Sequence, residues 1–240
     1  FGPEVFGGRA VSEIYLIRHG QASFGAADYD KLSELGERQA RAAGASLGHL
    51  GSPAILASGT MRRHLGTCRG FLESYAHDVP EVREDAAFNE YDHDAVLAAV
   101  MEGWMDPDAR MRWFAEQDHP GRAFHELFLK AAARWVSGAH EEDYEEPFAV
   151  FSARVKQGLE RVTRALQPDE DAIIFTSGGV ISALAREVLR FPDEVLVEVN
   201  LSMLNAGLTH LRYTRRGLQL VTFNSASHLA VISPELVTHY

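Results

Sequence analysis

Short apolar runs alternate with longer amphipathic segments at both ends of the 240-residue chain. Residues 14–17, 53–57 and 172–176 are apolar or small throughout, which is typical of strands buried on both faces. Helical segments are expected to follow at about 34–50, 60–75 and 180–189, each after one of these strands. This alternation predicts a three-layer α/β/α fold with a mostly parallel central sheet.

Local signals support several of these boundaries. Ser33 precedes the first helical segment, where its hydroxyl can accept a hydrogen bond from an early backbone N–H, and Gly51 follows the last residue of that segment. Beyond Pro192, the segments near 194–199, 203–213 and 218–223 have the length and composition of shorter strands. Arg215-Arg216-Gly217 predicts a hairpin turn between the last two.

The middle of the chain, from about 91 to 168, changes to a mostly helical pattern with tryptophan and phenylalanine residues spread through it. An acidic stretch at 141–146 interrupts this pattern and is typical of a solvated loop. We interpret residues 1–240 as a single domain in which 91–168 form a helical cap inserted over the strand ends.

Composition limits the classes of partner that the protein is expected to bind. There are 23 Lys and Arg residues against 34 Asp and Glu, a formal charge of -11, which argues against nonspecific binding to nucleic acid. The single cysteine, Cys68, cannot form an intramolecular disulfide, so a cytoplasmic location is expected. No stretch approaches the roughly 18 apolar residues of a membrane span, and we expect no membrane association. The chain begins at Phe1 without Met, so its native N-terminus stays open.

Each of the three buried strands ends in a polar or glycine-containing turn. In open α/β sheets ligands bind at the carboxyl ends of the strands, so these turns are expected to converge on one pocket. The first turn is Arg18-His19-Gly20. A histidine in this position can present a ring nitrogen as a nucleophile, while the arginine holds a phosphate through two parallel hydrogen bonds.

The second turn adds groups suited to an anion. Arg63 and Thr67 lie one helical turn apart on one face, and the helix N-terminus contributes backbone N–H donors. Farther along, Glu90 is a candidate general acid. Cleavage of a phosphate ester requires a proton for the departing alkoxide and then a base for the attacking water, and one carboxylate can serve both steps.

Together these motifs resemble the histidine phosphatase superfamily, the phosphoglycerate mutase-like enzymes, over nearly the whole chain. The strand followed by Arg-His-Gly resembles the family's opening motif, and residues 32–40 resemble its Leu-Thr-x-x-Gly-x-x-Gln-Ala helix start. Residues 58–67 resemble its Ser-x-x-x-Arg-x-x-x-Thr segment with one residue inserted. The insertion makes Arg63 the better match for the arginine, with Arg62 as the fallback.

The resemblance implies that His19 becomes transiently phosphorylated. It also implies that Arg18 and Arg63 bind the phosphoryl group, with Gln21 as a further phosphate-binding candidate, and that Glu90 donates the proton. No metal ion or organic cofactor is expected. The partner is then a small phosphorylated substrate or inorganic phosphate.

The chain departs from the family at the third turn. The family's Ser-His-Gly-Gly-type turn is Thr176-Ser177-Gly178-Gly179 here, so Ser177 stands where a second histidine is expected. A serine can donate one hydrogen bond to the phosphoryl group but carries no charge. Loss of a positioned donor typically costs ~10²–10³ in rate, which predicts a slowed enzyme more readily than an inactive one. His228, after the last predicted strand, is an alternative replacement.

The sequence therefore favours a phosphatase that hydrolyses phosphomonoesters through phosphohistidine on His19. Phosphoglycerate mutase-type transfer is one alternative, although the short segment 21–27 lacks the Glu-Ser-x-Trp-Asn pattern of a phosphoglycerate clamp. A non-catalytic phosphate-binding or regulatory module is another, because Ser177 could have removed turnover. A metal site at 90–94 and a serine hydrolase at Ser177 have weaker support. The natural substrate and the oligomeric state stay open.

Overall fold

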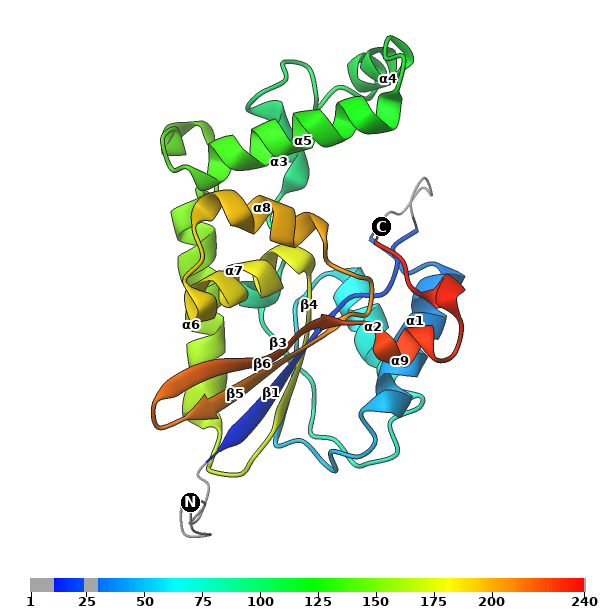
Figure 1. Ribbon diagram of the computed structural model, residues 1–240, viewed down its shortest axis with the longest axis vertical. Coiled ribbons are helices and arrows are strands. Elements are labelled where there is room, and N and C mark those ends of the chain that lie inside the picture. Colours follow the sequence, from blue (N-terminus) through cyan, green and yellow to red (C-terminus); the bar gives the residue numbers. More distant parts are fainter. Residues whose placement is uncertain (1–10, 24–29, 240) are drawn as a thin grey trace, which may run out of the picture.

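A six-stranded sheet forms the centre of the molecule in the computed structural model, which describes residues 11–23 and 30–239 (Figure 1). The strand order is β3-β2-β4-β1-β5-β6. The first four strands in this order run parallel, whereas β5 and β6 are antiparallel to their neighbours. The strands are β1 (Ser12–Arg18), β2 (Ile55–Ser58), β3 (Arg83–Glu84), β4 (Ala172–Thr176), β5 (Leu208–Thr214) and β6 (Gly217–Ser225).

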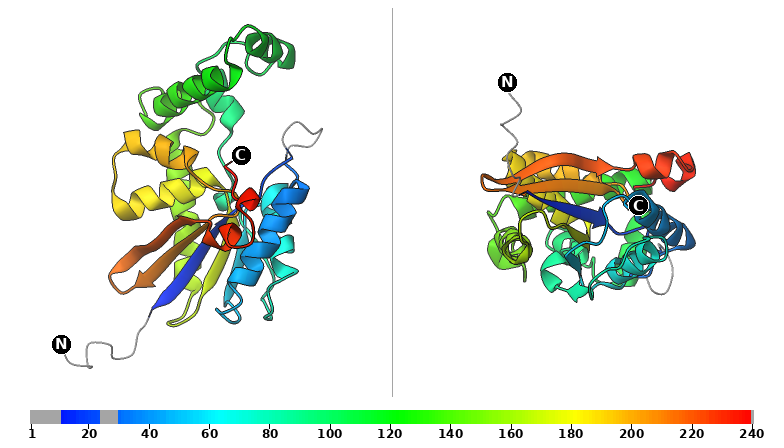
Figure 2. Two further views of the ribbon diagram at one scale, coloured as in Figure 1. Left: turned by 45° about the vertical axis from the view of Figure 1, so that its right-hand side comes forward. Right: turned by 90° about the horizontal axis from the view of Figure 1, so that it is seen from below.

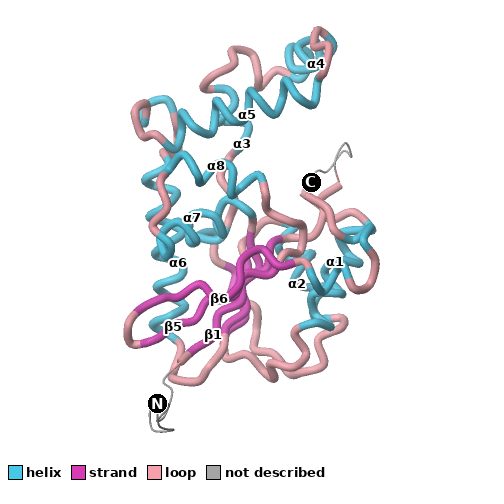
Figure 3. The backbone as a smooth tube through the Cα atoms, viewed as in Figure 1, coloured by secondary structure: helices cyan, strands magenta, loops and turns pink. Residues whose placement is uncertain are grey.

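Helices cover both faces of the sheet, which confirms the three-layer prediction (Figures 1 and 3). Successive side chains of a strand point to opposite faces, so Ile14 and Leu16 enter one apolar cluster while Tyr15 and Ile17 enter another. The first cluster includes residues of α6 (Phe148–Ala165) and α7 (Gly178–Leu189). The second includes residues of α1 (Glu34–Ser46) and α2 (Arg62–Leu72).

Local sequence explains where α1 begins. The Ser33 hydroxyl accepts a hydrogen bond of 3.1 Å from the backbone N–H of Gly36, as the sequence predicts for an N-cap. Arg215 and Arg216 turn the chain between β5 and β6, and Gly217 takes a φ of 100° there. The predicted hairpin is therefore confirmed.

The helices between residues 91 and 168 fall into two groups. Helices α3 (His93–Ala98), α4 (Pro107–Ala115) and α5 (Pro120–Val136) lie at one end of the molecule, beyond α8 (Asp193–Leu201) (Figures 1 and 2). Aromatic rings fill the space between them, for example Trp104 stacked on Phe124 with centroids 6.0 Å apart. Helix α6 instead runs along the sheet and packs on α7.

One strand prediction near the C-terminus is wrong, and another begins too early. Residues 194–199 lie inside the helix α8, because Leu196 and Val197 face the core while Asp193 and Glu194 occupy its first turn, where acidic residues are favourable. The predicted strand 203–213 begins only at Leu208. Residues 203–207 instead form a turn against the end of β1, where the amide of Ala206 donates to the carbonyl of His19 over 3.1 Å.

Candidate active site

The strand register brings the three predicted turns to one edge of the sheet. Arg18 pairs with Thr176 across β1 and β4, so the next residues, His19 and Ser177, follow side by side. The amide of His19 donates to the Thr176 carbonyl over 2.8 Å, and the amide of Gly59 donates to Phe175 over 2.9 Å. The ends of β1, β2 and β4 thus adjoin, as the sequence pattern predicts.

The imidazole of His19 is buried, with 7% of the residue exposed. Its Nδ1 lies 2.8 Å from the carbonyl of Gly20, which can only accept, so Nδ1 carries the hydrogen and Nε2 holds the lone pair. Burial lowers the pKa of His19 well below its usual value, and the charges of Arg18 and Arg63 lower it further. The ring is therefore neutral, with an unprotonated nitrogen.

The two adjacent arginines of α2 face opposite ways. Arg63 is 7% exposed and forms an ion pair of 2.6 Å with Asp30, whereas Arg62 is exposed. Thr67 lies one turn after Arg63, donates to its carbonyl and accepts the amide of Gly20 over 3.0 Å. The inserted residue in this segment therefore places Arg63, not Arg62, on the side of His19.

The guanidinium of Arg18 contacts the C-terminal part of the chain. Its Nη1 donates to the carbonyls of Met203 at 2.5 Å and His239 at 2.9 Å. The turn at 203–207 and the last described residue thus fix the position of this arginine.

Contacts with the turn after β4 hold Glu90 at the site. The hydroxyl of Thr176 donates to the carbonyl of Phe88 over 2.7 Å, which ties the segment before Glu90 to the end of β4. The buried carboxylate of Glu90 then accepts the amide of Gly179 at 3.0 Å, in the first turn of α7. A Cβ at Gly179 would lie 2.1 Å from Glu90 Oε1, so this close approach requires glycine.

Ser177 contacts a residue that the sequence did not single out. Its hydroxyl lies 2.5 Å from Nε2 of His64, and neither residue has exposed surface. The rings of His64 and His19 are 5.8 Å apart between centroids. Burial, followed by the charge of Arg63, lowers the pKa of His64 to about 3. A second neutral imidazole thus lies beside His19, on α2 rather than after β4.

The family model for the histidine phosphatase superfamily (branch 1) matches residues 14–226. The chain belongs to this superfamily. The matched range includes the ends of β1, β2 and β4 and the helices between them. No curated protein sequence matches this chain.

Solved structures of other family members share the fold. A mycobacterial glucosyl-3-phosphoglycerate phosphatase has a TM-score of 0.58 at 22% identity, covering 89% of this chain and 98% of its own. A phosphoglycerate mutase from Bacillus anthracis has a TM-score of 0.60 at 17% identity, covering 92% and 96%. A phosphoserine phosphatase mutant from Entamoeba histolytica, in complex with phosphoserine, has a TM-score of 0.60 at 17% identity, covering 91% and 99%.

Two other site candidates of this histidine phosphatase family member lie around this centre. Gln21 follows Gly20 and makes two hydrogen bonds. Its backbone N–H donates to the side-chain oxygen of Gln39 over 2.8 Å, and its side-chain oxygen accepts the hydroxyl of Ser33 at 2.9 Å.

His228 lies in α9 (Ser227–Ala230), which packs on α1. Burial lowers the pKa of His228 to about 4. It is His64, and not His228, that contacts Ser177.

The sequence offered His93, at the beginning of α3, only as part of a weakly supported metal site at 90–94. Burial lowers its pKa, the charge of Glu90 opposes that shift, and the charge of Arg63 adds to it. A residue of α3 therefore lies within electrostatic reach of both charged groups. Within residues 11–23 and 30–239, no three His, Cys, Asp or Glu side chains are grouped as a metal site requires. No helix in the same part of the chain is long and apolar enough to cross a bilayer.

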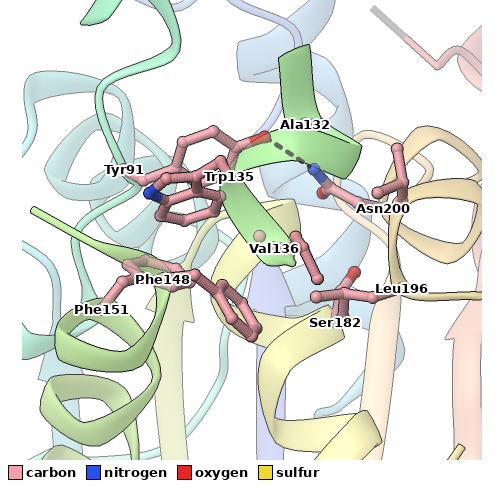
Figure 4. Close-up of a pocket in the computed structure, with 11 residues that line it drawn as sticks. Tyr91, Ala132, Trp135, Val136, Phe148, Phe151, Ser182, Leu196 and Asn200 are labelled. Carbon is pink, nitrogen blue, oxygen red and sulfur yellow. Dashed lines mark hydrogen bonds between the residues drawn. The ribbon is translucent and has the colours of Figure 1, made fainter. Parts of the chain in front are cut away.

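A small cavity lies between α5, α6, α7 and α8 (Figure 4). Its walls are mainly apolar, with Trp135, Phe148 and Leu196 among them, and the amide of Asn200 donates to the hydroxyl of Tyr91 over 3.2 Å at one end. Burial raises the pKa of Tyr91 well above its usual value, and the charge of Glu90 raises it further. This space lacks cationic walls, so it is a packing gap and not a phosphate pocket.

Proposed function

We propose that this chain hydrolyses small phosphomonoesters through a phosphohistidine intermediate on His19. The observation that carries the proposal is the state of that ring, which is neutral and held through Nδ1 by the Gly20 carbonyl. Its Nε2 is the nitrogen that can attack. Arg63, in the helix after β2, supplies positive charge, and Glu90, whose carboxylate accepts the amide of Gly179, supplies the proton that phosphoryl transfer requires.

In the first step Nε2 of His19 attacks phosphorus in line, and an N–P bond forms as the bond to the ester oxygen breaks. The departing oxygen takes a proton from Glu90. In the second step water attacks the phosphohistidine, Glu90 takes its proton, and the N–P bond breaks to release phosphate. Arg18 and Arg63 hold the equatorial oxygens, and Gln21 and Ser177 are additional donors to them.

Two observations favour hydrolysis over phosphoryl transfer to a second substrate, and a third favours a cytoplasmic location. Two of the similar solved structures are named as phosphatases, and one of them was solved with phosphoserine. The short segment 21–27 lacks a phosphoglycerate clamp pattern, although residues 24–29 lie outside the described residues. The chain has one cysteine, Cys68, which is buried. We also propose that residues 91–168 form a cap inserted in one domain, over the leaving-group side of the pocket.

The test is release of phosphate from p-nitrophenyl phosphate by the wild type and by His19→Ala, with EDTA present. His49→Ala is the matched control, because this histidine is exposed and lies beyond the end of α1. We expect activity in the wild type and in the control, and none in His19→Ala. Wild-type protein denatured during turnover should carry an acid-labile, alkali-stable phosphate. Activity that survives His19→Ala would refute the proposal.

A non-catalytic phosphate-binding module is the second candidate, because Ser177 replaces a histidine that the family resemblance implies. Such a module should bind vanadate at the His19 pocket and release no phosphate from any aryl or alkyl ester. Isomerisation of a phosphoglycerate, with little free phosphate, would instead assign mutase activity.

A further inference from the structure

Ser177 stands at the N-cap of α7 but does not cap the helix. An N-cap serine normally accepts a backbone N–H of the first turn, an interaction worth ~1 kcal/mol. Here the Ser177 side chain makes no such bond, and the Glu90 carboxylate accepts the amide of Gly179 instead. The Ser177 hydroxyl is directed at Nε2 of His64, 2.5 Å away. A local interaction has thus been replaced by one between residues 113 positions apart.

The other ring nitrogen of His64 determines which way this hydrogen bond runs. Nδ1 is fully buried and has no hydrogen-bond partner among the described residues. It packs against Gly59, where a Cβ would lie only 2.2 Å away, so glycine is required at that position. A neutral imidazole has one N–H, and a buried N–H without an acceptor is rarer in native structures than an unsatisfied acceptor. The hydrogen therefore belongs on Nε2, which donates to the Ser177 oxygen.

This direction leaves the hydroxyl hydrogen of Ser177 available for another acceptor. Ser177 follows β4 as His19 follows β1, and these two strand ends are paired neighbours. The rings of His64 and His19 are 5.8 Å apart between centroids, so the residue that contacts Ser177 also lies beside His19. We expect a phosphoryl group on Nε2 of His19 to bring its oxygens to this edge of the sheet.

We propose that His64 is a positioning residue that holds the Ser177 hydroxyl as a donor to the phosphoryl group, and that the pair replaces the second histidine of the family. The proposal rests on the proposed function. In both chemical steps the hydrogen stays on Ser177, and the pair adds hydrogen bonds to the equatorial oxygen without any proton transfer. The imidazole missing after β4 is thus supplied from the helix after β2, as a neutral group.

Four variants test whether His64 and Ser177 act as one unit. His64→Gln keeps an N–H four bonds from Cα, as in Nε2 of histidine, whereas His64→Met has similar length and no donor. We expect His64→Met and Ser177→Ala each to lower kcat for p-nitrophenyl phosphate by about 10- to 100-fold. The double variant should be no slower than the slower single variant, because both changes break one unit. His64→Gln should retain most of kcat.

Two readouts separate positioning from loss of structure. KM and the thermal midpoint of His64→Met should stay close to those of His64→Gln, so that the difference appears in kcat. His228→Met is the comparison, because it removes another histidine of low pKa, half-buried in α9, where it does not contact Ser177. A loss of kcat in His228→Met that exceeds that in His64→Met would overturn the proposal and assign the role to the C-terminal histidine.

An exchange of the two side chains gives an independent test. Ser177→His alone puts a second ring where the Ser177 hydroxyl already lies 2.5 Å from Nε2 of His64 and neither residue has exposed surface, so we expect a loss of both stability and rate. His64→Ser with Ser177→His moves the imidazole to the family's position and leaves the total volume unchanged. The exchange variant should be at least as active as the wild type. An exchange variant slower than Ser177→His alone would contradict the inference.

The outcomes also distinguish this inference from the proposed function. Wild-type activity that His19→Ala abolishes, together with unchanged kcat in His64→Met, would overturn only the inference. Activity that does not depend on His19 would overturn the proposed function. In that case vanadate titration of the same variants still decides the inference. Equal, non-additive losses of affinity in His64→Met and Ser177→Ala would support it, and multiplicative losses would refute it.

Discussion

Substituting Gly179 with alanine should remove the general acid without unfolding the protein. The added Cβ would lie 2.1 Å from Oε1 of Glu90 and 2.7 Å from the ring of Tyr91. Because Tyr91 is stacked on Trp135 with centroids 4.4 Å apart, the carboxylate has more freedom to move than the ring. An ordinary contact between carbon and oxygen is roughly 3.3 Å, so Oε1 has to retreat by about 1 Å. The hydrogen bond of 3.0 Å to the Gly179 amide would be strained or lost.

A displacement of ~1 Å at a reacting group can cost about 10²-fold in rate, and a general acid contributes ~10²–10⁴-fold. We therefore expect kcat for an alkyl phosphate to fall about 100-fold in Gly179→Ala. The change in stability should be small, because alanine is favoured over glycine within a helix by roughly 0.5–1 kcal/mol and this gain offsets part of the steric cost of ~1–3 kcal/mol. The thermal midpoint should then fall by no more than about 8 °C for a chain of this length.

The assay compares glycerol phosphate with p-nitrophenyl phosphate. Nitrophenolate leaves without protonation, and kcat/KM reports the first step without the later attack of water, so Gly179→Ala should lose much less kcat/KM on the aryl ester than on the alkyl ester. Gly121→Ala is the matched control, since Gly121 is also the second residue of a helix and a Cβ there meets no atom within 4 Å. Equal losses on the two esters, or no loss on either, would refute the assignment of Glu90 as the acid.

Three further predictions concern stability and reactivity. The pKa of His64 is about 3 in the folded state and 6.5 in the unfolded state, so as pH falls below 6.5 only the unfolded state takes up a proton at this residue. Near pH 4.5 this should lower the free energy of unfolding of the wild type by about 3 kcal/mol relative to neutral pH. Urea unfolding should show a smaller loss in His64→Gln. Phe71 is fully buried and meets Phe175 edge-on with centroids 5.2 Å apart, so Phe71→Ala should lower the free energy of unfolding by about 3–5 kcal/mol, and an unchanged urea midpoint would contradict this. Burial raises the pKa of Cys68 to about 12, so iodoacetamide near pH 8 should label it only in unfolded protein, and rapid labelling of folded protein would show that the thiol is accessible.

The sequence predicted those parts of the fold whose signals are local and agree with one another. The strand at 14–17 is apolar throughout because both faces of β1 are covered, and Ser33 marks the start of α1 through its own hydrogen bond. Segment 194–199 has Val-Leu-Val in a row, a composition that favours strands, but its acidic first turn and its packing through Leu196 and Val197 favour helix. There tertiary contacts overrode local propensity.

The positions of candidate site residues could be predicted where two side chains that act together lie in the same turn of the sequence. Arg18 and His19 are adjacent after β1, and the choice of Arg63 over Arg62 follows from its one-turn spacing to Thr67. His64 lies in the same predicted segment, but nothing local distinguishes it from a structural histidine. Its significance comes only from Ser177, 113 residues away, and that contact requires the strand order β2-β4-β1.

The position of His64 also changes how the missing histidine should be interpreted. In a parallel sheet the carboxyl ends of neighbouring strands lie about 5 Å apart, so a side chain lost from one end can be replaced from the next without a change of fold. The replacement here is not equivalent, because burial keeps His64 neutral where a protonated imidazole would add a positive charge. In the proposed mechanism the positive charge at the phosphoryl group then comes from Arg18 and Arg63, and Asp30 offsets part of the charge of Arg63. The exchange of Ser177 and His64 therefore tests two properties at once, namely the place of the imidazole through kcat and its charge through the pH dependence of vanadate affinity.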